Sequence, residues 1–453
     1  ARSLKPVAGA NPACTSIGGQ LMAARLDARK EDFAQKFSAL VEGNRESEED
    51  VSRIVREIIA DVRSRGDAAL CEYSKRFDNI DLTSETLRVP AAEIDAAEKV
   101  ATPERIEALR LAANRIEAFH LRQLPEDLRY KDESGAQLGW RWRAVESVGL
   151  YVPGGTASYP SSVLMNGVPA RVAGVKRVIM MTPASGGSIN PLTLIAARIA
   201  GVEEIYRVGG AQAIAALSYG TETVKPVAKI VGPGNAYVAS AKREVFGHVG
   251  IDMIAGPSEI LVVADGKNDP AWIAADLLSQ AEHDASSQSI LISDDSDFTD
   301  AVAAEVERQL GVLPRREIAS ASWRDHGAII VVGNLEDAAP LVDAIAPEHL
   351  EIATDNPEDF LALINNAGAV FLGRYTPEAI GDYIAGPNHV LPTSRAARFS
   401  SGLSVLDFMK RTTLLSCDAG ALDALGSAAL CLADAEGLDA HAKSISIRLN
   451  RKK

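Results

Sequence analysis

Short apolar runs rich in β-branched residues alternate with helical segments from Val148 onwards. Runs that stay apolar throughout predict strands buried on both faces, and helices between consecutive strands predict parallel connections. The runs are too numerous for one small sheet, so the sequence predicts an α/β fold with two Rossmann-like parallel-sheet units. The predicted strands are residues 148–152, 177–181, 204–208, 229–231, 259–264, 289–293, 328–332, 349–353 and 369–372.

The first third of the chain is predicted to be helical. Apolar residues from Val51 to Val62 recur at the three- and four-residue spacing of one helix face, and Gly66 ends that pattern. Thr102 and Pro103 are residue types that begin helices, which predicts a second helix to about His120. Near the C-terminus, residues 422–435 and 438–449 are predicted to form two short helices on either side of Gly437.

Changes in composition divide the chain into four expected parts. Residues 1–46 are expected to form an N-terminal leader and helical segment. Within them, residues 1–19 lack the apolar centre of a secretory signal. Residues 47–147 and 252–385 are expected to form the first α/β unit, which carries most of the candidate catalytic residues. Residues 148–251 are expected to form the second unit, and 386–453 a small helical C-terminal appendage.

Composition excludes several classes of protein. The formal net charge of −14 argues against nucleic acid or an anionic membrane as the main partner. No apolar run reaches the roughly 18 residues of a membrane helix. The cysteines are scattered and form no CxxC pair, which argues against a thiolate zinc site or a disulfide framework and indicates a reducing cytoplasm. They are Cys14, Cys71, Cys417 and Cys431.

Three glycine turns each follow a predicted strand and precede a helix. They lie at residues 151–155, 208–212 and 231–237. Glycine lets a phosphate approach the backbone, and the free N–H groups at the helix start face that phosphate. None of the turns is GxGxxG, and no acid follows at the spacing of the dinucleotide fingerprint. A dinucleotide site and ordinary tight turns between strand and helix both remain open on this pattern alone.

Several polar residues are candidates for holding a divalent metal ion. Gln280 and His283 share one helix face, and Asp382 lies on a short predicted helix further along the chain. Glu436 and His441 flank Gly437 in the tail. Nitrogen and oxygen donors without thiolate favour zinc, manganese or a similar ion. Solvent-facing helix surfaces show the same residue types, and spacing alone does not bring these residues together.

Glu348 and His349 place an acid beside an imidazole at one end of a predicted strand. Successive strand residues point to opposite faces, so one of the pair can be structural while the other reacts. If the pair lies at the carboxyl end of a strand, where the chain turns into a loop, both side chains can reach a cleft. Side chains that exchange protons near neutral pH are mostly His and carboxylates, which makes this pair the leading candidate for catalysis.

Taken together, these segments resemble the histidinol dehydrogenase family from about Ser47 to the C-terminus. The stretches that carry the resemblance are VGLYVPGG at 148–155, GPGNA at 232–236, AGPSE at 255–259, SQAEH at 279–283, APEHL at 346–350, GPNHVLPT at 386–393 and EGLDAH at 436–441. Each stretch is unspecific by itself, and the combination is specific.

The resemblance implies an aldehyde-dehydrogenase-like fold and the oxidation of L-histidinol to L-histidine through the aldehyde, in two NAD-dependent steps. It implies one zinc ion per subunit and a homodimer in which the tail of one subunit completes the site of the other. It implies Glu348 and His349 as the proton-transfer residues. The implied zinc ligands are Gln280, His283, Asp382 and His441. Substrate contacts are implied for those four residues and for Ser258, His349, His389 and Glu436, and NAD contacts for Tyr151, Gln212 and Asn235.

Three other functions fit parts of the same pattern. A relative that oxidises another polar alcohol, such as a diol sulfonate, needs a basic group in place of Glu436, whose carboxylate suits an ammonium group. A zinc hydrolase that uses Glu348 to activate water needs no glycine turns for a dinucleotide. A catalytically inactive scaffold needs none of the candidate residues. The cysteines lie outside strand ends and glycine loops, which favours a water route over a cysteine route for the aldehyde step.

Overall fold

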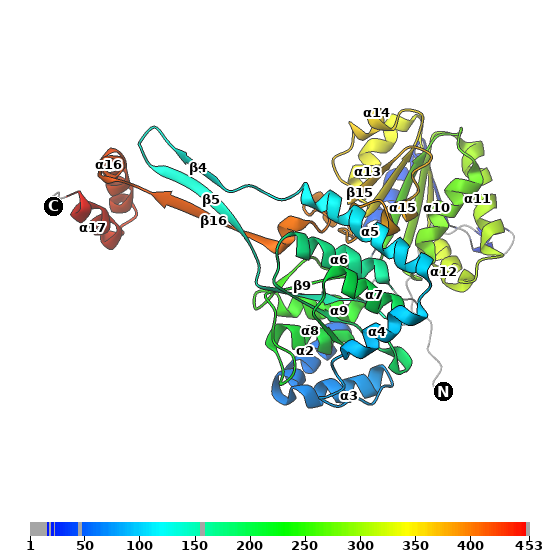
Figure 1. The fold of residues 1–453 in the computed structure, drawn as a ribbon. Helices are drawn as coiled ribbons and strands as arrows, with labels where there is room; N and C mark the ends of the chain where they lie inside the picture. The colour runs from blue at the N-terminus through cyan, green and yellow to red at the C-terminus, as the bar shows by residue number, and fades with distance from the viewer. Residues whose placement is uncertain (1–15, 18–19, 22, 44–47, 155–158, 450–453) are drawn as a thin grey trace.

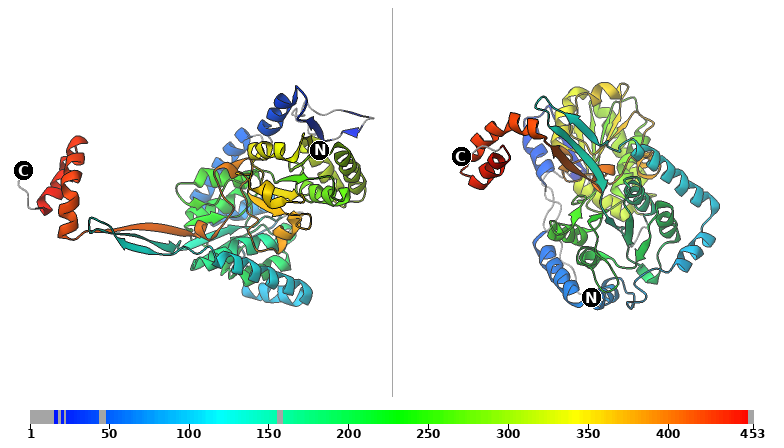
Figure 2. Two further views of the ribbon diagram at one scale, coloured as in Figure 1. Left: turned by 90° about the horizontal axis from the view of Figure 1, so that it is seen from above. Right: turned by 60° about the vertical axis from the view of Figure 1, so that its left-hand side comes forward.

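The computed structural model describes residues 16–17, 20–21, 23–43, 48–154 and 159–449. Most of the expected leader at 1–19, and Gly155 of the first glycine turn, lie outside these residues. The described part forms two parallel sheets covered by helices, plus an antiparallel arm that carries two helices away from both sheets (Figures 1 and 2). The expected α/β fold with two parallel-sheet units is confirmed.

The first sheet has five parallel strands in the order β10-β9-β6-β7-β8. Its strands are β6 (Ser147–Tyr151), β7 (Arg177–Met181), β8 (Glu204–Tyr206), β9 (Lys229–Val231) and β10 (Gly250–Ile251). Its connecting helices are α6 (Pro160–Val172), α7 (Pro191–Ala200), α8 (Gly210–Tyr219) and α9 (Ala236–Val245). The order reverses between β6 and β9, which is where doubly wound sheets open a crevice at the carboxyl ends of their strands.

The second sheet has six parallel strands in the order β15-β14-β11-β12-β13-β3. Its strands are β3 (Ala24–Asp27), β11 (Glu259–Ala264), β12 (Gln288–Ser293), β13 (Ala328–Val331), β14 (His349–Ala353) and β15 (Ala369–Leu372). Its helices are α1 (Phe33–Glu42), α10 (Pro270–Ala281), α11 (Ser296–Leu310), α12 (Arg316–His326), α13 (Ala339–Ile345), α14 (Pro357–Leu361) and α15 (Glu378–Tyr383). All residues of β11, β12 and β14 are buried, as continuous apolar runs predict.

Three expected boundaries need correction, and two of them lie before residue 148. The helices of 47–147 pack on the five-stranded unit and share its core, although they were expected beside the six-stranded sheet. They are α2 (Glu48–Arg65), α3 (Asp67–Phe77), α4 (Ala91–Val100) and α5 (Pro103–Leu121). An apolar stripe shows that a helix needs a partner surface without showing which one. Residues 24–27, inside the expected leader and helical segment, form edge strand β3.

The arm consists of β4 (Leu128–Lys131), β5 (Gln137–Ala144) and β16 (Met409–Ser416), paired antiparallel, with α16 (Ala419–Ala435) and α17 (Asp439–Arg448) at its tip. Its strands are mostly exposed on both faces. Residues 386–408 were assigned to the C-terminal appendage, but Val390, Leu403 and Phe408 belong to the core of the five-stranded unit. The protruding part therefore begins at β16.

Candidate active site

A hydrogen bond to a backbone carbonyl determines which nitrogen of the His349 ring carries the proton. It is the first residue of β14 and is buried. Its Nδ1 lies 2.9 Å from the carbonyl oxygen of Glu259 on the neighbouring strand β11, so the Nδ1–H group donates to that oxygen. Nε2 then carries the lone pair, and it has no hydrogen-bond partner among the described residues. Burial lowers the pKa of His349, which favours the neutral ring with a free lone pair on Nε2.

Glu348 lies beside His349 and is also buried. The Glu259 N–H group donates to Glu348 Oε2 at 2.9 Å, which holds the carboxyl in place. Burial raises the pKa of Glu348 well above its usual range, and the Glu259 N–H opposes that shift. The pair lies at the amino end of β14. A cleft at the carboxyl end of a strand, as considered from the sequence, would lie at the opposite end of the sheet. The predicted strand 349–353 already put the pair at an amino end, and a loop meets the sheet there as well.

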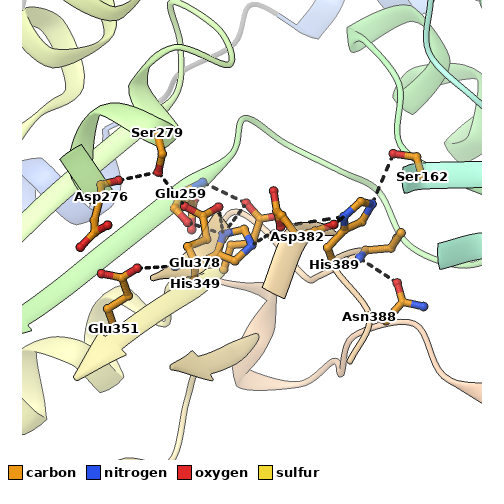
Figure 3. A network of polar contacts seen from close by, with 12 residues as sticks. Ser162, Glu259, Asp276, Ser279, His349, Glu351, Glu378, Asp382, Asn388 and His389 are labelled. Carbon is orange, nitrogen blue, oxygen red and sulfur yellow. Dashed lines mark hydrogen bonds and ion pairs between the residues drawn. The ribbon is translucent and has the colours of Figure 1, made fainter. Parts of the chain in front are cut away.

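His349, Glu378 and Asp382 form a group of three potential metal ligands (Figure 3). Nε2 of His349 lies 3.8 Å from Asp382 Oδ1, and Nδ1 lies 3.6 Å from Glu378 Oε1. One ligand atom from each of the three residues fits within 4.8 Å of the others. Glu378 was not identified from the sequence. The available signal was its position one helical turn before Asp382 on α15.

Gln280 supplies the clearest sign of a missing binding partner. It lies near the end of α10, and both its amide oxygen and its amide nitrogen are buried without a hydrogen-bond partner among the described residues. Such a group costs about 1–3 kcal/mol unless something binds it. His283 follows one turn later and is partly open to solvent. Desolvation by the surrounding protein lowers the pKa of its ring, and the Asp382 carboxylate opposes that shift. These donors fit a divalent ion with nitrogen and oxygen ligands.

His389 and Ser258 lie at the same end of the six-stranded sheet. His389 Nδ1 is 2.9 Å from the backbone oxygen of Asp382, so Nδ1–H donates to it and Nε2 accepts from the Ser162 hydroxyl at 3.3 Å. Asp382 belongs to α15 and Ser162 to α6, so the two bonds of His389 together join the two units. Ser258 immediately precedes β11, and its carbonyl accepts a hydrogen bond from Gln288.

The glycine turns cluster at the carboxyl ends of the five-stranded sheet. The Gly210 N–H donates to the Tyr151 hydroxyl at 3.1 Å, and a Cβ on Gly210 would lie 2.7 Å from the Gln212 amide oxygen. Gly232 adopts a positive φ of 110° and lies so close to Tyr151 that a Cβ would meet its carbonyl oxygen at 2.1 Å. Asn235 caps α9 by accepting hydrogen bonds from two N–H groups. Tyr151 therefore lies between the two turns that carry Gln212 and Asn235.

Comparison with known proteins decides the family. The histidinol dehydrogenase family model matches residues 41–449. The chain is 63% identical to histidinol dehydrogenase of Rhizobium meliloti (strain 1021) over 429 residues, covering 95% of this chain and 99% of that protein. It is 65% identical to the enzyme of Mesorhizobium japonicum over 429 residues, covering 95% of this chain and 100% of the relative. The chain belongs to the histidinol dehydrogenase family.

A solved structure supports the same assignment. The crystal structure of histidinol dehydrogenase from Elizabethkingia anophelis superimposes with a TM-score of 0.91 at 38% identity, covering 96% of this chain and 99% of the other. Histidinol dehydrogenases are oxidoreductases, and their reaction is the last step of histidine biosynthesis. No helix in the described ranges of this family member is long and apolar enough to cross a membrane.

Two residues that the family resemblance assigns to the site lie elsewhere in the single chain. Glu436 ends α16 and His441 lies on α17, at the tip of the arm and away from α10, α14 and α15 (Figures 1 and 2). The tip also exposes large apolar side chains. Leu415, Leu432 and Ile447 are 69%, 65% and 60% exposed. Apolar surface gathered on a protruding element is typical of a protein–protein contact.

Proposed function

We propose that this chain oxidises L-histidinol to L-histidine through the aldehyde in two NAD-dependent steps, with one zinc ion per subunit. Two buried groups without a hydrogen-bond partner among the described residues support this most directly. They are the Gln280 amide and His349 Nε2, which lies 3.8 Å from Asp382 Oδ1. A zinc-dependent hydrolase would leave the glycine turns around Tyr151 without a ligand. We therefore assign those turns to NAD, with contacts from Tyr151, Gln212 and Asn235.

Gln280, His283 and Asp382 are proposed to hold zinc, together with His441 from a second copy of the chain. Bound zinc would hold the imidazole and amine of histidinol, so that the alcohol carbon faces the nicotinamide. Bound NAD would accept the hydride in each of the two oxidations. Ser258, His389 and Glu436 are proposed to contact the substrate, and the Glu436 carboxylate suits its ammonium group. Glu378 adds a further oxygen ligand or a partner for His349 within the same group.

The buried pair divides the proton transfers between the two steps. The alcohol carbon loses its hydride only as the hydroxyl loses its proton, and His349 Nε2 is the lone pair positioned to accept that proton. The aldehyde must be hydrated before a second hydride can leave. Glu348, whose pKa is raised by burial, is proposed to accept a proton from the water that adds to the aldehyde.

The experiment that tests this function counts reduced cofactor. We expect two NADH per L-histidinol consumed, with activity abolished by a chelator and restored by zinc. One NADH per substrate would show a simple alcohol dehydrogenase, and none would remove the dehydrogenase function. Full activity after verified metal removal would exclude the positioning role of zinc.

A further inference from the structure

A carboxylate outside the residues named so far lies against the glycine turn after β8. Asp78 follows the end of α3. A Cβ on Gly209 would lie 3.4 Å from Asp78 Oδ2 and 2.7 Å from the Cβ of Pro183, which follows β7. The same Pro183 lies against Gly154, which follows β6. Asp78 therefore reaches the place where turns from three neighbouring strands meet, although it comes from a helix much earlier in the chain.

One carboxyl oxygen of Asp78 has no role within the protein that the structure shows. Oδ2 is buried and has no hydrogen-bond partner among the described residues. Burial raises the pKa of Asp78. Burial also raises the pKa of Tyr151 to about 12, and the charge of Asp78 adds to that shift, so the two groups lie within electrostatic reach. A buried acceptor without a donor is costly, and a ligand that brings hydroxyl groups removes the cost.

The position corresponds to the ribose-binding place of a doubly wound sheet. In that fold an acid near the end of the second strand accepts hydrogen bonds from the ribose hydroxyls of NAD, and it excludes the 2′-phosphate of NADP. The strands β6, β7 and β8 occupy the first three positions of that order here. The residues that follow β7 are Thr182, Pro183 and Ala184, so that loop supplies no acid.

We propose that Asp78 accepts hydrogen bonds from the ribose of the adenosine half of the dinucleotide and determines the preference for NAD over NADP. This assignment rests on the proposed NAD-dependent function. It explains how a sheet whose own turns lack the fingerprint acid recognises the cofactor: the acid directly follows α3, which packs on the same unit.

The test measures binding apart from catalysis. Asp78→Asn keeps the shape and removes the charge, and Asp78→Ser shortens the side chain. Charged hydrogen bonds of this kind predict roughly 10- to 100-fold weaker ADP-ribose binding by calorimetry and a matching rise in KM for NAD, with kcat for histidinol within about two-fold. The ratio of kcat/KM for NAD over NADP should fall by at least about ten-fold.

Asp81→Asn is the matched control, because Asp81 lies three residues further on, is exposed, and pairs with Lys75 at 3.0 Å. It should leave ADP-ribose binding unchanged. If folded Asp78→Asn or Asp78→Ser protein binds ADP-ribose as wild type does, the assignment is wrong; if Asp78→Asn does not fold, Asp78→Ser decides. Wild-type protein that binds ADP-ribose through Asp78 but does not oxidise histidinol would remove the proposed function and leave this assignment standing.

Discussion

The candidate functional groups of the two sheets lie at opposite ends of their strands. In the five-stranded sheet, Tyr151 and the turns at Gly209 and Gly232 lie at the carboxyl ends of strands. In the six-stranded sheet, Glu259 and His349 are the first residues of β11 and β14, so the proposed catalytic group lies at the amino ends. The carboxyl ends offer backbone N–H groups and glycine, whereas the amino ends offer buried imidazole and carboxyl side chains.

The two regions also differ in how their charges are balanced. In the five-stranded unit, buried Lys242 pairs with buried Asp252, and both groups bind the backbone of Gly232. In the six-stranded unit, burial raises the pKa of Glu348 and Glu378 well above the usual range. At Gly232 the first region thus neutralises its own charges, while the second gathers acceptors whose desolvation a bound cation would offset.

The largest expected effect tests whether the catalytic group is complete within one chain. His349→Asn should lower activity by about 10²- to 10⁴-fold because it removes the proton acceptor, and His441→Asn should abolish zinc-dependent activity. A mixture of the two inactive proteins should form hybrid dimers with one intact site, recovering about a quarter of wild-type activity at random exchange. Steady-state NADH formation after mixing measures this recovery.

Each variant mixed with itself serves as the control and should stay inactive. Mass measurement of differently tagged subunits confirms that exchange occurs. Exchange without recovered activity would place the complete site within one chain, which would contradict the role proposed for the protruding arm.

The next largest effect concerns the charge pair in the five-stranded unit. Lys242→Met leaves Asp252 buried without its cation, and loss of one partner of a buried pair costs about 3–5 kcal/mol. Urea unfolding should show this decrease in the free energy of unfolding, and Lys242→Met/Asp252→Leu should recover part of it. Lys229→Met is the matched control in the same unit, because Lys229 and Asp407 are partly exposed and their salt bridge is worth less. Equal losses for the two lysines would show that the buried pair has no special role.

The sequence predicted which segments form strands and helices better than it predicted which of them pack together. Apolar runs such as 259–264 and 349–353 match strands because they are buried on both faces. The arm strand 137–144 was missed, because it is at most partly buried and carries Arg and Trp rather than a buried apolar run. The stripe from Val51 to Val62 predicted a helix correctly but not the sheet on which it packs, since that depends on contacts distant in sequence.

The candidate sites were predictable to different degrees. Glycine after a strand is a local signal, so the turns around Tyr151 were identified without the structure. The meeting of His349 with Asp382 is not local, and it was expected only from the family resemblance. Glu378 and Asp78 were missed because a single acid in a helix or at its end resembles a solvent-facing residue until the fold brings it beside a site.

The smallest expected effect separates a structural from a binding role at the glycine turns. Asn235 Oδ1 accepts hydrogen bonds from the N–H groups of Tyr237 and Val238 at 3.1 and 3.2 Å, so Asn235→Ala should lower the free energy of unfolding by about 1 kcal/mol. Asn235→Asp keeps the acceptor and loses the amide N–H donor. It should preserve stability within a few tenths of a kcal/mol and raise KM for NAD by roughly three- to ten-fold.

Asn190 provides the matched comparison, because it caps α7 in the same unit by accepting from the Leu192 N–H at 2.8 Å. Asn190→Asp should change neither stability nor KM for NAD appreciably, since it retains its cap and lies on a different turn. Thermal unfolding and initial rates at varied NAD measure both quantities. If Asn235→Asp matches Asn190→Asp in both measurements, Asn235 is only a helix cap. Recognition of the cofactor at the carboxyl ends of the five-stranded sheet would then depend on Tyr151, Gln212 and Asp78 alone, because a residue that only caps its own helix does not recognise the cofactor.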